Sequence, residues 1–73
     1  MTSGIYYIKN IITEKGYIGS SKNIYRRKNE HFRELRKSKH ANKHLQGSWN
    51  KYGEESFIFS IVINCPEEYI FKL

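Results

Sequence analysis

The sequence contains one cysteine, one proline and no aspartate among its 73 residues. A single cysteine cannot form an internal disulfide, which excludes the small secreted, disulfide-stabilised proteins and favours a reducing compartment. No apolar run approaches the roughly 18 residues of a membrane-spanning helix, and residues 1–12 lack the pattern of a signal peptide. We therefore expect an intracellular protein that is not secreted and has neither a membrane partner nor a disulfide partner.

Acidic side chains are also few. Seven glutamates are outnumbered by 13 lysines and arginines, which gives a net charge of +6 and a pI near 9.6. This excess favours a polyanion as the partner. Hydrophobic residues still make up 38% of the chain and aromatic residues 15%, too many for a disordered chain. We expect one small folded domain, since so short a chain has no room for a second core.

Three segments have the composition of β-strands. Residues 3–9 and 16–20 are rich in β-branched and aromatic side chains and predict a hairpin around residues 10–15. A register that pairs Tyr6 directly with Tyr17 would place both rings on the same side of the sheet. Glycines beside these rings would let another backbone or a ligand come close. Residues 57–63 predict a third strand that is well buried.

A first helix is predicted between the hairpin and residue 38. Ser20 or Ser21 would be its N-cap, and it would run to about Lys37. Arg27 and His31, four residues apart, would lie together at the rim of the apolar face, where core meets solvent. That face would be formed by Ile24, Tyr25, Phe32 and Leu35.

A second, shorter helix is predicted after residues 38–41, ending at Gly53. Pro66, followed by Glu67 and Glu68, indicates the start of a third helix, because proline suits the first helical position and carboxylates suit the first turn. The sequence ends at Leu73, after about two turns. We interpret residues 1–73 as one domain that is incomplete at its C-terminus, with a truncated third helix.

Two tripeptides, Gly-Ile-Tyr at residues 4–6 and Tyr-Ile-Gly at 17–19, are followed by Arg27, His31 and His40. This pattern resembles the GIY-YIG nuclease family. The segment at residues 45–53 is most similar to the phage and intron-encoded homing endonucleases within that family. The resemblance covers the whole chain and implies an α+β fold in which a three-stranded antiparallel sheet is flanked by helices.

The resemblance also implies an activity, namely metal-dependent hydrolysis of a phosphodiester in double-stranded DNA, usually with one Mg²⁺. Tyr6 or Tyr17 would deprotonate or orient the attacking water, and Arg27 would stabilise charge on the phosphate. His31 would assist proton movement or bind the phosphate, and His40 would have a further role. The family's metal-binding glutamate would fall beyond residue 73, so no metal ligand is assigned within the sequence.

Other interpretations of the same residues stay open. The chain could be a non-catalytic, basic nucleic-acid-binding remnant of such a nuclease, or an inactive fragment that folds only marginally. The two tyrosines could be only a packing pair and Arg27 only a solvated charge. His40 and His44 have helical zinc-ligand spacing but lack a second ligand pair, and Cys65 is expected to be inert. The basic segment at residues 33–43 could contact phosphates or simply be solvated.

Overall fold

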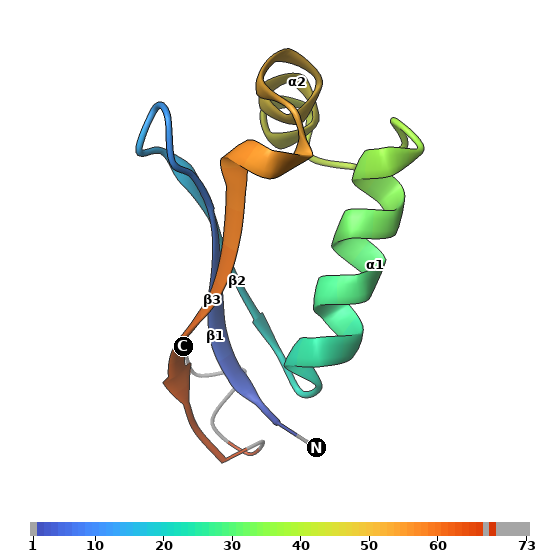
Figure 1. Ribbon diagram of the computed structural model, residues 1–73. Helices are drawn as coiled ribbons and strands as arrows, with labels where there is room; N and C mark the ends of the chain where they lie inside the picture. Colours follow the sequence, from blue (N-terminus) through green and yellow to red (C-terminus); the bar gives the residue numbers. More distant parts are fainter. Residues whose placement is uncertain (1, 67, 69–73) are drawn as a thin grey trace.

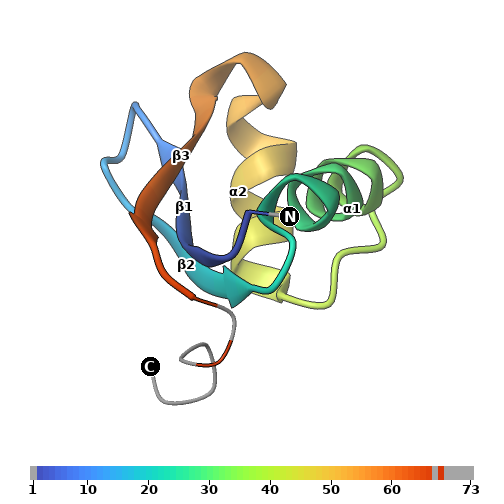
Figure 2. The same cartoon turned by 90° about the horizontal axis from the view of Figure 1, so that it is seen from below.

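The computed structural model describes residues 2–66 and residue 68. Its three strands pair in antiparallel fashion in the order β2-β1-β3, and both α-helices of the described residues lie on one side of the sheet (Figures 1 and 2). The predicted three-stranded antiparallel sheet is therefore confirmed. The predicted third helix falls mainly outside the described residues. In chain order the elements are β1 (Gly4–Asn10), β2 (Gly16–Ser21), α1 (Ile24–Arg36), α2 (Lys43–Tyr52), the 3₁₀ turn η1 (Glu54–Ser56) and β3 (Phe57–Asn64).

The register of the hairpin differs from the predicted one. Tyr6 lies opposite Gly19, and Tyr17 lies opposite Ile8. The difference amounts to two residues, and because side chains alternate with a period of two, Tyr6 and Tyr17 still project from the same face. Their ring centroids are 6.5 Å apart. The prediction was thus wrong about direct pairing and right about the shared face.

Asn10 explains why the hairpin closes where it does. Its side-chain oxygen accepts hydrogen bonds from the backbone N–H groups of Ile12 (2.9 Å) and Thr13 (3.3 Å), which organises the turn. Its amide nitrogen donates to the Ser48 hydroxyl of α2 at 2.9 Å. One buried side chain therefore fixes both the hairpin tip and its distance from α2.

The N-cap of α1 is Asn23, whose side chain accepts a hydrogen bond from the Arg26 N–H at 3.2 Å. The prediction of Ser20 or Ser21 was wrong, because both serines still belong to β2 and pair with β1. Asn caps as well as Ser does, so only the length of the strand decided between them. The helix ends at Arg36 with Lys37 as its C-cap, close to the predicted end.

Helix α2 follows its predicted course. Asn42 caps its first turn by accepting from the Leu45 N–H at 3.0 Å, and the helix stops at Gly53, whose φ of 87° suits glycine. No helix in the described part of the chain has the length and apolarity needed to cross a membrane.

The core lies between the sheet and the two helices. Because the helices cover one sheet face, the side chains of β3 alternate between half-buried and exposed along most of its length, and Ile58 and Val62 face away from the core. The prediction of a well-buried third strand was wrong for this reason. Tyr25, expected on the apolar face of α1, is 56% exposed. The buried apolar residues are Tyr6, Ile8, Ile24, Leu35, Leu45 and Trp49.

Candidate active site

Four of the five predicted site residues meet in one cluster between the sheet and α1. Tyr6 comes from β1, Tyr17 from β2, His31 from α1 and His40 from the segment between the helices. The His31 ring lies at the centre, with centroid distances of 5.4 Å to Tyr6, 5.3 Å to Tyr17 and 4.9 Å to His40. Three elements and one loop thus bring together groups that lie up to 34 positions apart (40 − 6).

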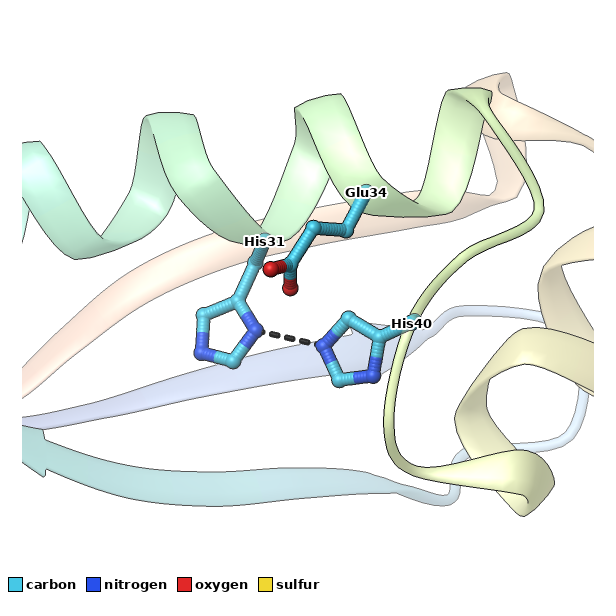
Figure 3. A group of neighbouring side chains, drawn as sticks. All are labelled: His31, Glu34 and His40. Atoms are coloured by element: carbon cyan, nitrogen blue, oxygen red, sulfur yellow. Dashed lines mark hydrogen bonds between the residues drawn. The ribbon is translucent and has the colours of Figure 1, made fainter.

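A chain of short hydrogen bonds runs through this cluster. The Tyr6 hydroxyl and His31 Nε2 are 2.6 Å apart. His31 Nδ1 and His40 Nε2 are also 2.6 Å apart, and Figure 3 shows this second hydrogen bond. His40 Nδ1 accepts from the backbone N–H of Asn42 at 3.0 Å. Both ring nitrogens of each histidine therefore have a partner, which explains how the imidazoles can be buried.

His31 is 0% exposed, so its predicted position at the rim of the helix was wrong. The wheel of α1 places it next to the apolar face, but the hydroxyl of Tyr6 and the ring of His40 complete its hydrogen bonding inside the core. These partners come from outside the helix, and periodicity alone could not reveal them.

Arg27 borders the cluster, one turn before His31 on α1. Its side chain is 37% exposed, and Nη1 contacts the Glu30 carboxylate at 3.2 Å. The guanidinium also lies close enough to Tyr6 to oppose the rise in that phenol's pKa. Arg27 therefore occupies the rim position that was predicted for it, with its charge between the cluster and solvent.

Burial and neighbouring groups shift the pKa values of the cluster. Burial, with a smaller contribution from Tyr17, raises the pKa of Tyr6 to about 12. Burial, followed by the charges of Arg27 and His40, lowers the pKa of His31 to about 4, although Glu30 acts in the opposite direction. Burial also lowers the pKa of His40. At neutral pH Tyr6, His31 and His40 are therefore uncharged, and Arg27 supplies the positive charge at the edge of the cluster.

The lowered pKa of His31 predicts that acid destabilises the fold. The unfolded chain binds a proton at His31 near pH 6.5, whereas the folded chain resists it down to about pH 4. The contribution of His31 to the free energy of unfolding should therefore be constant above pH 7 and should fall by about 3 kcal/mol as the pH falls from 6.5 to 4. Urea unfolding followed by Trp49 fluorescence at several pH values would measure this loss.

His44, which is exposed, offers a matched control. The His44→Gln variant should keep the pH dependence of the parent, whereas His31→Gln should make the loss of stability between pH 6.5 and 4 smaller, since the lowered pKa of His40 still contributes to it. Identical pH profiles for the parent and His31→Gln would show that His31 is not buried in its neutral form.

The hydrogen bonds of His31 and His40 also bear on a possible metal site in the cluster. His31, Glu34 and His40 offer ligand atoms within 4.8 Å of one another (Figure 3). Two imidazoles and one carboxylate are a poor set for Mg²⁺, which prefers oxygen ligands. The facing nitrogens of His31 and His40 already bind each other, and Asn42 donates to the far nitrogen of His40. Among the described residues, this set therefore does not fit the Mg²⁺ ion that was expected, and His44 does not join it.

Sequence reasoning missed two supporting residues. Gln46 accepts from the His40 N–H at 3.1 Å and donates to the Leu35 carbonyl at 3.1 Å, which holds the loop between the helices. Asn42 combines the cap of α2 with the bond to His40. An asparagine before a helical pattern predicts a cap, but nothing in the sequence connects it to a histidine two residues earlier.

Gly19 allows a close approach to its backbone, as expected of a glycine beside the tyrosine rings, and the group that comes close is the Tyr6 ring. Gly19 lies opposite Tyr6, and a Cβ at this position would overlap the Tyr6 hydroxyl and ring. The missing side chain therefore leaves room for the ring to lie across β2 and reach His31.

Comparisons with known proteins identify the family of this chain. The family model of the GIY-YIG catalytic domain matches residues 2–71. The chain is 44% identical over 68 residues to Intron-associated endonuclease 1 of Enterobacteria phage T4, covering 93% of this chain and 27% of that protein. It is 43% identical over 58 residues to Probable intron-encoded endonuclease 1 of Neurospora crassa, covering 80% of this chain and 18% of that protein. The chain thus spans under a third of either relative.

Solved structures of the catalytic domain of intron endonuclease I-TevI show the same fold. A mutant of that domain has a TM-score of 0.87 and 40% identity, covering 99% of this chain and 75% of that one. Another structure of the domain also has a TM-score of 0.87, with 39% identity, covering 96% of this chain and 77% of that one.

The fold and these matches therefore define an endonuclease catalytic domain that is similar to those of intron-encoded endonucleases. More particularly, the chain belongs to the GIY-YIG family. The resemblance inferred from the two tripeptides is confirmed. Members of this family are generally metal-dependent.

Proposed function

We propose that this chain is the cleaving domain of a homing endonuclease that hydrolyses a phosphodiester in double-stranded DNA inside the cell. One observation carries the proposal. An arginine that solvent can reach borders a cluster of two tyrosines and two histidines in which the buried Tyr6, His31 and His40 are uncharged at neutral pH. A phosphate at this edge would meet a permanent positive charge beside hydroxyl and imidazole groups that can pass protons.

The chemistry assigns a different role to each residue. Arg27 would bind the non-bridging phosphate oxygens with its planar donor fork and stabilise the charge that develops during hydrolysis. Tyr17, which is partly exposed, would contact and orient the attacking water. Tyr6 is buried and hydrogen-bonded to His31, so it would act indirectly, from the buried side of the site. His31 is neutral and bonded at both nitrogens, which favours proton movement over phosphate binding, and His40 would support it.

We further propose that Mg²⁺ is the ion and that its ligands come from residues that follow position 73 in a longer protein. Support comes from the donor chemistry, since the carboxylate of Glu34, which lies within 4.8 Å of ring nitrogens of His31 and His40, belongs to a nitrogen-rich set. When bound, the ion would polarise the phosphate and lower the pKa of a bound water. On this view residues 1–73 form a catalytic domain that is incomplete at its C-terminus.

Plasmid nicking tests the proposed activity directly. The longest translation product that contains these 73 residues should convert supercoiled DNA to nicked or linear DNA in Mg²⁺ and should not do so in EDTA. The 73-residue chain alone should bind DNA with an affinity that falls steeply with salt, because basic side chains displace counterions. Cleavage in EDTA at the rate found in Mg²⁺ would contradict the metal requirement.

The alternative function is a non-catalytic, basic nucleic-acid-binding remnant. The net charge of +6 favours it, and so does the row of exposed Lys37, Lys39 and Lys43 within the basic segment. Arg36 of the same segment is instead held by the Glu54 carboxylate, at 2.9 and 2.6 Å. Salt-sensitive DNA binding without nicking by the long product in any divalent metal would favour this alternative.

A further inference from the structure

The hydrogen-bond chain through the site has a direction. Its fixed end is the backbone of Asn42, whose N–H can only donate. Since this N–H points at His40 Nδ1, that nitrogen must carry a lone pair and no proton. A neutral imidazole then has its proton on Nε2, the atom that lies 2.6 Å from His31 Nδ1.

The same logic passes from one ring to the next. His40 Nε2 donates, so His31 Nδ1 accepts, and the proton of His31 is on Nε2. His31 Nε2 in turn faces the Tyr6 hydroxyl oxygen at 2.6 Å, so this oxygen accepts the bond. The opposite order would set the N–H of Asn42 against an N–H of His40 and leave a partly buried backbone donor without this partner.

The orientation of each ring is fixed by both of its ends. Turning the His40 ring over would exchange both nitrogens with carbons, and the bonds to Asn42 and to His31 would be lost together. The charged and titratable groups that face these rings are Arg27, Glu30 and Glu34 from α1, with Tyr6 and Tyr17 from the sheet. Among the described residues, neither Glu30 nor Glu34 is hydrogen-bonded to either imidazole, so these acidic groups do not reverse the order of donors and acceptors.

We propose that the backbone amide of Asn42, acting through His40 as a positioning residue, fixes the tautomer of His31 so that His31 donates a hydrogen bond to the Tyr6 oxygen. The Tyr6 hydroxyl proton is then directed away from His31, and His31 is not the base that removes it. A negative charge on the Tyr6 oxygen would be stabilised by the His31 N–H. The role of this arrangement in catalysis rests on the proposed function, but the tautomers themselves do not.

Histidine tautomers can be measured by long-range ¹H–¹⁵N correlation NMR on the ¹⁵N-labelled 73-residue chain at pH 7, without DNA or metal. We expect a single tautomer with the proton on Nε2 for both His31 and His40. A proton on Nδ1 of either ring would overturn the proposal. Because no nuclease activity is needed, a protein that fails to cut DNA would leave this result unaffected.

Two variants of Asn42 separate the amide from the side chain. Asn42→Pro removes the N–H, and the φ of −82° at this residue is close to the value that proline requires. Asn42→Ala keeps the N–H. Both variants lose the side chain that caps α2, so they differ in the N–H and not in the cap. We expect His40 to lose its single-tautomer pattern only in Asn42→Pro. An unchanged tautomer in a folded Asn42→Pro variant would overturn the role of the amide.

A second pair of variants tests His40 itself and covers the case in which Asn42→Pro does not fold. The amide nitrogen of glutamine can occupy the place of the imidazole Nε2, whereas that of asparagine occupies the place of Nδ1. His40→Gln should therefore preserve the His31 tautomer, and His40→Asn should lose it. The same His31 tautomer in both variants would overturn the role of His40.

Discussion

The Arg27→Ala variant is expected to lose nicking activity by a factor of about 10² to 10³, the typical effect of removing one donor that stabilises transition-state charge. Arg27 supplies the positive charge at the edge of a cluster in which Tyr6 and His31 are neutral, so neither of these residues can replace it at neutral pH. The assay compares the rates of plasmid nicking by the long translation product and its variant in Mg²⁺. Arg27→Lys should recover only part of the activity, since an ammonium lacks the planar fork.

Arg26 is a matched control for this experiment. It is the preceding residue on α1, its side chain is 74% exposed, and it contacts the same Glu30 at 3.6 Å. Arg26→Ala removes the same charge and disturbs the same acidic partner, yet it should leave nicking within a few-fold of the parent. Equal nicking rates for Arg27→Ala and the parent would refute the role of Arg27. DNA binding that survives the substitution, with no nicking by either protein, would favour the DNA-binding remnant.

The Gly4→Ala variant is expected to lose about 3 kcal/mol or more of unfolding free energy, from combined backbone strain and steric overlap. Gly4 has a φ of 150°, and a Cβ there would overlap the backbone carbonyl oxygen of Ile63 on β3. Gly4 pairs with Ser21 of β2 and Asn64 of β3, so the clash would push the central strand away from a neighbour. A domain of this size has few kcal/mol to lose, and much of the variant should be unfolded.

Gly47→Ala makes the same chemical change where space is free. Gly47 lies within α2, and no neighbouring atom comes within 4 Å of the added Cβ. Alanine should therefore stabilise the helix by up to about 1 kcal/mol. Urea unfolding monitored by circular dichroism should move the midpoint down for Gly4→Ala and up for Gly47→Ala. A midpoint for Gly4→Ala equal to that of the parent would contradict the described approach of β1 to β3.

These predictions assign distinct duties to the glycines of the two tripeptides. Gly4 allows the close approach of β1 to β3, and Gly19 leaves room for the Tyr6 ring. The catalytic proposal depends on both, because Tyr6 reaches His31 only if the ring can cross the space beside β2. The motif can thus be explained by packing around the site as well as by the chemistry within it.

Local patterns in the sequence were sufficient for much of the fold. Alternation and β-branching predicted the three strands, the glycine at position 53 predicted the end of α2, and the tripeptides with Arg27, His31 and His40 predicted the family. These signals are local because strand period, helix period and backbone conformation are set within a few residues. The errors at Ser20, Ser21 and Tyr25 arose where two neighbouring elements compete for the same residues or for the same face.

The sequence by itself determined which chemical groups this domain carries and on which elements they lie, because both depend on residue type and spacing. Only the tertiary structure decided that His31 is buried and neutral, that Tyr6 lies opposite Gly19, and that Asn42 directs the hydrogen bonds of two histidines. Each of these depends on contacts between segments distant in the chain or on a backbone amide, which every residue but proline carries. Residue type and spacing therefore do not predict these three features, and only the folded structure reveals them.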